Sequence, residues 1–291
     1  MSNAALRIMT YNTHHSAGND IEEHYGTSKH QIPGADYALD LPRVADVISA
    51  LNPDIVALQE VDRFWARSAY ADQTEEFANL LQMDVRFGAN VMHEADDHAS
   101  TPHEYGVATL SRHPINNHTH RLLPTTTGWE QRGMLDTRID VPGIGKVAII
   151  NTHLQVGGKD QQEEGRRQRI QQSQFLANYL ASLDMPVIVL GDFNTERESG
   201  DLAALIGEGS SLVDVWEVAG KGTGETIFNG AHGEATARID YILVSPHFNV
   251  ISAEVIDNEV SRMASDHFPL IAELGFTGTP GTPEATDVLY N

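Results

Sequence analysis

Carboxylate, amide and imidazole side chains recur in this sequence where a short hydrophobic segment begins or ends. The clearest case is Asp192 with Asn194, which follow the apolar residues 187–190 and the chain-breaking Gly191. An Asx turn closing a strand would explain this pair alone. Strand ends, however, are where α/β folds hold reactive groups rigidly. The residues that share this placement are Asn12, Glu60, His153, Asp192, Asn194, Asp240, Asp266 and His267.

Each of these residues also has an ordinary structural explanation when it is considered alone. Asn12 could cap a turn, Glu60 could be a surface carboxylate, and His153 could be a core histidine bonded to the backbone. Asp240 is harder to explain because it lies within an apolar segment. A buried carboxylate costs free energy unless it is paired, hydrogen-bonded or bound to metal. The pattern as a whole, and not one residue, indicates a site.

The metal chemistry follows from the ligand types. Oxygen ligands in a chain without cysteine suit Mg²⁺ or Mn²⁺ better than a structural zinc ion. Asn12, Glu60 and Asp266 would hold such an ion and leave positions for water and a phosphate oxygen. Asp192, oriented by Asn194, would take the proton of an attacking water.

The histidines complete a phosphoester-hydrolysing set. His153 and His267 would stabilise the charge that develops around phosphorus and protonate the leaving oxygen. Asp240 would fix the tautomer of His267. The predicted reaction is therefore in-line attack of water on a phosphoester, assisted by a divalent metal ion.

Composition restricts the partners of this 291-residue chain. It has no cysteine, which excludes disulfides, thiolate metal sites and cysteine nucleophiles. The 19 basic and 41 acidic residues give a formal charge of −22, which disfavours a high-affinity nucleic-acid binder but not a phosphorylated substrate beside a cation. We find no apolar run long enough to span a bilayer. A soluble protein, cytoplasmic or exported, is expected, and its oligomeric state is not indicated.

Hydrophobic patterning predicts one domain over residues 6–274, because no linker or low-complexity block divides it. Residues 1–5 resemble a tag remnant that replaces the native start, and residues 275–291 are expected to form a flexible tail. Two face-to-face sheets with helices outside are expected. The predicted strands are 6–11, 54–60, 105–112, 134–141, 146–150, 187–190, 238–244 and 268–274, and the predicted helices are 40–51, 73–82 and 163–183.

Three predicted loops, 13–38, 92–104 and 155–163, are expected to determine substrate choice. The second contains His93, His98 and His103. Their spacing of five matches neither a helix face nor a known ligand pattern, which favours a solvated loop over an accessory metal site.

Seven short motifs follow one another along nearly the full length of the chain. They are TYN at 10–12, LQE at 58–60, GVATLSR at 106–112, NTHL at 151–154, GDFN at 191–194, RIDY at 238–241 and SDHFPL at 265–270. In this order they resemble the motifs of the endonuclease/exonuclease/phosphatase superfamily, which includes DNase I-like nucleases, abasic-site endonucleases, neutral sphingomyelinases and inositol-polyphosphate 5-phosphatases. The opening motif with its two histidines is similar to a poorly characterised bacterial branch of metal-dependent hydrolases.

The resemblance implies a DNase I-like α/β fold, a four-layer sandwich of two packed, mostly antiparallel sheets flanked by helices. It implies that Glu60 is the principal metal ligand, with Asn12 and Asp266 near the metal. By the same resemblance, Asp192 and Asn194 position the water and contact the phosphate.

The resemblance also implies that His267 and Asp240 form a phosphate-binding pair. His153 stands where abasic-site endonucleases carry tyrosine, which disfavours that activity. Arg132 is either a phosphate contact or a surface arginine, and His15, with His14, either lines the substrate mouth or caps the loop.

The leading hypothesis is a Mg²⁺- or Mn²⁺-dependent phosphoesterase acting on a small or lipid-linked phosphodiester. The first alternative is a DNA or RNA endonuclease or exonuclease, which a local basic groove would favour. The second is a catalytically silent binding protein on the same scaffold, which a non-functional metal site would favour.

Overall fold

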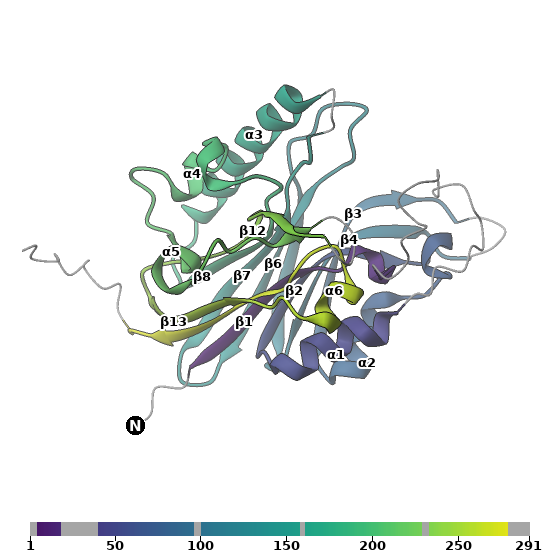
Figure 1. The fold of residues 1–291 in the computed structure, drawn as a ribbon, viewed down its shortest axis with the longest axis horizontal. Helices are drawn as coiled ribbons and strands as arrows, with labels where there is room; N and C mark the ends of the chain where they lie inside the picture. Colours follow the sequence, from purple (N-terminus) through teal and green to yellow (C-terminus); the bar gives the residue numbers. More distant parts are fainter. Residues whose placement is uncertain (1–4, 19–39, 96–99, 158–160, 229–232, 279–291) are drawn as a thin grey trace, which may run out of the picture.

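The computed structural model describes residues 5–18, 40–95, 100–157, 161–228 and 233–278. Two six-stranded sheets pack face to face, and helices cover their outer faces (Figure 1). The predicted four-layer sandwich is confirmed.

The first sheet has the strand order β13-β14-β1-β2-β4-β3. Only β1 and β2 of these neighbours run parallel. The carboxyl ends of these two strands therefore meet at the same edge of the sheet. The strands are β1 (Leu6–Asn12), β2 (Ile55–Arg63), β3 (Asp84–His93), β4 (His103–Ser111), β13 (Phe248–Val255) and β14 (Leu270–Phe276).

The second sheet has the strand order β5-β6-β7-β8-β12-β9, with β7 and β8 parallel and the other pairs antiparallel. A two-stranded sheet, β10 (Ile227–Phe228) with β11 (Ala235–Ala237), lies in the segment before β12. The six strands are β5 (Ile115–Leu122), β6 (Gly133–Val141), β7 (Gly145–His153), β8 (Val187–Asp192), β9 (Val213–Asp214) and β12 (Asp240–Val244).

Alternation along the central strands divides the core into layers. In β1, Ile8 belongs to the cluster between the sheets, whereas Met9 and Tyr11 belong to the cluster beneath the helices α1 and α2. A third cluster joins the second sheet to α3 and α4. The helices are α1 (Leu41–Leu51), α2 (Gln73–Leu81), α3 (Gln162–Leu180), α4 (Ala203–Ile206), α5 (Val215–Ala219) and α6 (Glu259–Ala264).

The helix α1 begins where the sequence predicts. The side chain of Asp40 accepts the backbone N–H of Arg43 at 3.0 Å, and Pro42 occupies the first turn, where no amide hydrogen is needed. Asn52 ends the helix in the left-handed conformation. No helix in the described ranges is both long and apolar enough to cross a membrane.

The prediction of a loop over 92–104 is wrong at both ends. The strand β3 continues to His93 and β4 begins at His103, and these two residues are paired across the hairpin. Both rings contact Trp65, whereas His98 lies outside the described residues. Much of the predicted loop 13–38, part of the loop 155–163, and most of both predicted flexible ends also lie outside them. The strand β14 continues to Phe276, so the predicted tail begins inside a strand.

Candidate active site

Strand register brings three predicted site residues into one row across the second sheet. His153 of β7 pairs with Asp192 of β8, and Asp192 pairs with Asp240 of β12. Each side chain is at least 98% buried. Residues separated by up to 87 positions in the sequence therefore meet because their strands are neighbours in the sheet.

His267 joins this row from the segment that enters β14. Its Nδ1 lies 2.8 Å from Asp240 Oδ2, and its Nε2 lies 3.8 Å from Asp192 Oδ2. Burial disfavours the charged ring, but Asp240 and Asp192 raise the pKa of His267 well above its usual value. The ring is therefore an imidazolium held between two carboxyl groups, with its Nδ1–H donated to Asp240.

Asp192 has the properties of a proton acceptor. Burial and the neighbouring Asp240 raise the pKa of Asp192 to about 7. Its Oδ1 accepts the backbone N–H of Asn194 at 2.8 Å, which fixes the carboxyl plane. A base whose pKa lies near neutrality is suited to proton transfer from water.

His153 differs from His267 because its nearest polar partners are Arg132 and Asn194, with Asp192 Oδ2 at 3.5 Å from its Nε2. Arg132 Nη1 lies 3.1 Å from its Nδ1, and Asn194 Nδ2 lies 2.9 Å from its Nε2. Burial and the charge of Arg132 hold the pKa of His153 well below its usual value. His153 is therefore neutral and His267 is charged, a division that assigns different proton roles to two rings in one site.

Asn12, at the end of β1, connects the two sheets. Its Nδ2 donates to Glu60 Oε1 at 3.2 Å and to Asp192 Oδ2 at 3.0 Å. The backbone N–H of His14 donates to Asn12 Oδ1 at 3.1 Å, which determines the orientation of the amide. In this orientation Asn12 donates to two carboxylates, and its role as a metal ligand stays a prediction.

The prediction that Glu60 lies at a strand end is wrong, because β2 continues to Arg63. It lies in an irregularity of the ladder, where the register passes from Leu58 paired with Ala108 to Val61 paired with Gly106. The φ of Glu60 is +56°, an unusual value for a residue with a side chain. Bulges commonly redirect a side chain beside an active site. Here the bulge, and not a strand end, places the carboxylate of Glu60 at the candidate site.

The carboxylate of Glu60 is ionised and partly exposed. Burial alone would raise its pKa, but the facing ring of His15 holds the pKa well below its usual value. His15 Nδ1 lies 3.8 Å from Glu60 Oε2, and the carboxylate retains 23% exposure. A charged, accessible oxygen pair of this kind can accept a cation.

The histidines His14 and His15 lie in a strained turn beside this carboxylate. They belong to the 3₁₀ turn η1 (His14–Ser16), in which all three residues have positive φ. His14 Nδ1 lies 3.9 Å from Asp266 Oδ1, and the two histidine rings are 4.6 Å apart. The turn thus places one imidazole against each of the carboxylates Glu60 and Asp266. Strained backbone of this type is concentrated at functional sites.

Arg132 is buried, with only 5% exposure, so the surface-arginine alternative is wrong. Besides His153, it contacts Glu130 at 2.9 Å and Gln155 at 3.4 Å. Its contact with a phosphate stays a prediction.

The carboxyl groups of the site fit a divalent cation. In the described ranges, Asp192, Asp240 and His267 place one ligand atom each within 4.8 Å of the others, and Asp240 Oδ1 is buried without a hydrogen-bond partner there. The oxygens of Asp192 and Asp240 and a ring nitrogen of His267 are the ligand atoms that this group offers to an ion. With Glu60 the set is oxygen-rich, as Mg²⁺ and Mn²⁺ prefer.

Sequence reasoning missed two amides that join the sheets behind the site. Gln59 Nε2 donates to Asn151 Oδ1 at 2.8 Å, and Asn151 donates to the backbone oxygens of Leu58 and Ala108. All of these contacts are buried. Gln59 directly precedes Glu60, and Asn151 lies two residues before His153, so both belong to the motifs LQE and NTHL. Their place in these motifs is the sequence signal that could have identified them.

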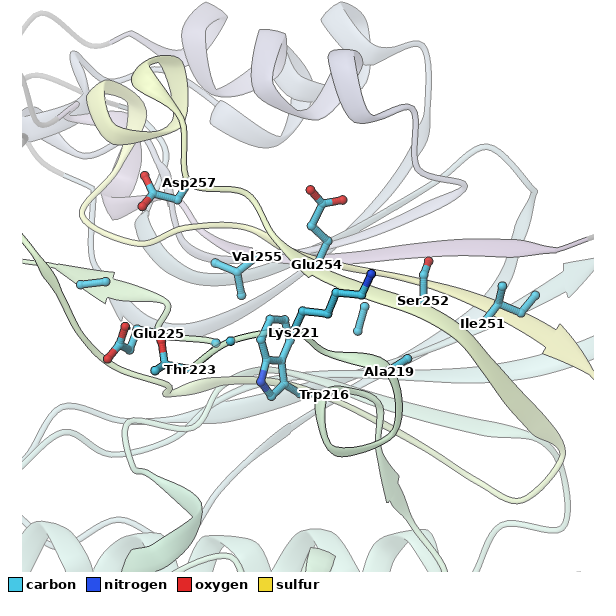
Figure 2. A pocket seen from close by; sticks show the side chains of 14 residues that line it. Trp216, Ala219, Lys221, Thr223, Glu225, Ile251, Ser252, Glu254, Val255 and Asp257 are labelled. Carbon is cyan, nitrogen blue, oxygen red and sulfur yellow. Dashed lines mark hydrogen bonds between the residues drawn. The ribbon is translucent and has the colours of Figure 1, made fainter.

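A cavity of about 680 Å³ lies over β13, α5 and the glycine-rich segment 220–224. Figure 2 shows Trp216 and Lys221 beside Ser252 and Glu254 of β13. None of the residues lining it belongs to the row of His153, Asp192 and Asp240. We therefore separate this cavity from the candidate active site.

Solved structures share this fold. An endonuclease/exonuclease/phosphatase from Beutenbergia cavernae is 26% identical, with a TM-score of 0.70 over 94% of this chain and 72% of that chain. A mannosyl-6-phosphatase from Bacteroides thetaiotaomicron is 20% identical, with a TM-score of 0.67 over 93% of this chain and 100% of that chain. The catalytic domain of human Nocturnin is also 20% identical, with a TM-score of 0.65 over 94% and 95% of the two chains.

Sequence comparison agrees with the structural one. Protein cwh43 of Schizosaccharomyces pombe is 28% identical over 149 residues, which are 51% of this chain and only 14% of that protein. The profile of the Endonuclease/Exonuclease/phosphatase family matches residues 9–267, which include every predicted site residue. The chain therefore belongs to the endonuclease/exonuclease/phosphatase family.

Proposed function

We propose that this protein is a divalent-metal-dependent phosphoesterase that hydrolyses a small or lipid-linked phosphodiester through in-line attack of water. The observation that carries the proposal is the buried row in which Asp192 lies between a neutral and a charged histidine, 3.5 Å from His153 Nε2 and 3.8 Å from His267 Nε2. This arrangement provides a proton acceptor and a cationic donor within one site.

Family membership supports the reaction class. Members of this family are hydrolases acting on phosphoester bonds, and they include phosphatases, phosphodiesterases and nucleases. The mannosyl-6-phosphatase among the structural neighbours is compatible with a small substrate. The net charge of −22 opposes binding of a polyanion, which favours a small or lipid-linked ester over nucleic acid.

The proton and bond changes balance within this site. Water attacks phosphorus while Asp192 takes its proton, with Asn194 holding the carboxyl plane. The bond between phosphorus and the leaving oxygen breaks, and the leaving oxygen keeps the electron pair and takes a proton from His267 Nε2. Asp240 Oδ2 accepts the Nδ1–H on the opposite side of that ring. His153 is neutral in this scheme and adds no positive charge. Reprotonation of His267 by Asp192 would restore the starting state.

The metal requirement is assigned to the carboxylates nearest the strained turn. Family enzymes typically use divalent metal ions, and Glu60 and Asp266, with Asn12 beside them, would hold the ion here. A bound Mg²⁺ or Mn²⁺ supplies Lewis-acid stabilisation of the charge on the phosphate oxygens. Asp192 and Asp240 are the alternative position, which a direct metal-binding measurement on variants of both groups distinguishes.

The test is hydrolysis of bis-p-nitrophenyl phosphate, p-nitrophenyl phosphate and supercoiled plasmid with Mg²⁺ or Mn²⁺. We expect turnover of the diester that EDTA abolishes and that Glu60→Gln reduces by about tenfold to 150-fold, because an interaction with a charged group is lost. The matched control is Glu163→Gln, an exposed glutamate at the start of α3. Plasmid nicking would replace the proposal with a nuclease, and activity that persists in EDTA would contradict metal dependence.

A further inference from the structure

The first residue of α2 places one buried amide between two segments of the candidate active site. Gln73 is only 1% exposed. Its Nε2 donates to the backbone oxygen of His15 at 2.7 Å, and its Oε1 accepts the backbone N–H of Asp62 at 2.9 Å. A backbone oxygen can only accept and a backbone N–H can only donate, so the orientation of this amide is fixed.

These two hydrogen bonds lie where β1 and β2 separate. The parallel pairing of the two strands ends with Asn12 opposite Gln59, whereas β2 continues to Arg63. Beyond Gln59, β2 therefore no longer has β1 as its neighbour. Gln73 joins the chain that follows β1 to the continuing part of β2, as a ladder hydrogen bond joins the two strands before this point.

Both segments that Gln73 joins contain strained backbone. All three residues of the turn η1 have positive φ, +42° at His15. Glu60, two residues before Asp62, has a φ of +56°. Such conformations cost free energy and persist only where the surrounding contacts determine them. The hydrogen bonds of Gln73 are contacts of this kind, and they act on both strained segments at once.

Other contacts fix the position of Gln73 itself. Asp72, the N-cap of α2, accepts hydrogen bonds of 3.0 and 2.8 Å from Arg63 at the end of β2. The fully buried carboxylate of Asp62 accepts two hydrogen bonds of 2.8 Å from Arg67. The amide of Gln73 is therefore held by β2 on one side, and it can determine where the turn lies on the other.

The turn carries an imidazole that faces the carboxylate of Glu60. His15 Nδ1 lies 3.8 Å from Glu60 Oε2. Asn12, directly before the turn, donates to Glu60 Oε1 at 3.2 Å. A movement of the turn relative to β2 would change the surroundings of both carboxylate oxygens.

We propose that Gln73 is a positioning residue that holds the turn η1 against the bulge of β2 and thereby determines how His15 and Glu60 face each other. Its importance for the reaction rests on the proposed function, in which Glu60 holds the divalent ion. Gln73 acts through the backbone of His15 and Asp62 and is therefore not a catalytic residue.

The test replaces Gln73 by methionine, which fills the space of an unbranched side chain without an N–H donor. Gln168→Met is the matched control, since Gln168 is fully buried and its partners, the backbone of Thr126 and the side chain of Glu164, lie outside the candidate site. Both variants should lower the urea unfolding midpoint, and only Gln73→Met should disturb the site. If Gln73→Met does not fold, Gln73→Glu keeps the acceptor for Asp62 and removes the donor for His15.

The first measurement is the NMR spectrum of the histidine rings in EDTA, in which the signal of His15 is assigned by its loss in His15→Gln. We expect the signal of His15 to shift or broaden in Gln73→Met and to stay in place in Gln168→Met. An unchanged signal in Gln73→Met, or an equal change in both variants, would overturn the proposal.

The second measurement is the dissociation constant of Mn²⁺, followed by the EPR signal of the free ion, for the site that Glu60→Gln removes. We expect Gln73→Met to raise this Kd by about tenfold, the effect of one lost hydrogen bond, and Gln168→Met to change it by less than twofold. Equal Kd values for Gln73→Met and the wild-type protein would overturn the proposal. If the wild-type protein binds no Mn²⁺, the metal assignment of the proposed function fails, while the signal of His15 still decides whether Gln73 positions the turn.

Discussion

The contact between Asp240 and His267 predicts a specific loss of activity in Asp240→Asn. Asp240 Oδ2 and His267 Nδ1 are 2.8 Å apart, and both side chains are at least 94% buried. The substitution keeps the shape of the side chain but removes the negative charge that stabilises the imidazolium. The asparagine can also present its amide nitrogen to the ring, which would favour a different tautomer.

The magnitude follows from the type of contact. A hydrogen bond to a charged group contributes about 1.5–3 kcal/mol, against about 1 kcal/mol for a neutral one. If the lost free energy belongs to the transition state, kcat/KM falls by about tenfold to 150-fold. His267 acts through the same contact. The double variant Asp240→Asn with His267→Gln should therefore lose no more than a few-fold beyond the larger of the two single losses.

The assay is kcat and KM for bis-p-nitrophenyl phosphate with the four proteins of this double-mutant cycle, alongside their urea unfolding midpoints. Asp136→Asn is the matched control, since Asp136 is equally buried but bonds Arg138 at 2.5 Å and Tyr179, neither of which is a site residue. It should lower stability and leave kcat unchanged. Losses that multiply in the double variant, or an Asp240→Asn rate within twofold of wild type, would refute the pairing.

Two further predictions concern stability and are measured by urea unfolding. Arg67→Ala leaves the fully buried carboxylate of Asp62 without its paired guanidinium. It should lower the free energy of unfolding by about 2–3 kcal/mol, after allowance for the partial exposure of Arg67. A loss below about 1 kcal/mol would contradict this prediction. Gly191→Ala places a Cβ 1.9 Å from the backbone oxygen of Thr152 in the neighbouring strand, and should cost at least about 3 kcal/mol. Gly200→Ala, at a positive φ in open space, is its control and should cost about 1–2 kcal/mol.

The fold could be predicted where the hydrophobic pattern reflects burial on two faces. The central strands β1, β2, β7, β8 and β12 are almost wholly buried, so their apolar runs are continuous and bounded by polar residues. The edge strands β5 and β13 were missed because most of their side chains are exposed. Their pairing to β6 and β14 depends on main-chain hydrogen bonds, which leave little trace in the side-chain pattern.

The helix α3 shows a second limit of pattern reading. A search for apolar residues would assign Ile170 to the buried face, but Ile170 is 40% exposed, whereas Gln168 and Gln172 are fully buried. These amides bond the loops on either side of β6 and β7: Gln168 accepts from the backbone of Thr126, and Gln172 contacts Pro124 and Gln155. Part of the buried face is polar because it pairs with loop backbone, and a search for apolar periodicity assigns such residues to the surface.

Positions in the site were predictable, whereas protonation was not. His153 and His267 both follow from strand-end placement, and the sequence assigns each the same two possible roles. Asp192 lies near both rings, and their other partners separate them: Arg132 and Asn194 contact His153, while Asp240 contacts His267.

This difference arises from the elements that supply the partners. Arg132 directly precedes β6, the neighbour of β7, and lies beside His153, whereas Asp240 opens β12 of the second sheet and meets His267, which lies just before β14 of the first sheet. Exchanging the charges of these two neighbours would exchange the protonation preferences of the two rings without altering either ring's position. The protonation preference of each histidine thus depends on residues from other elements, and a motif that contains only the histidine cannot specify it.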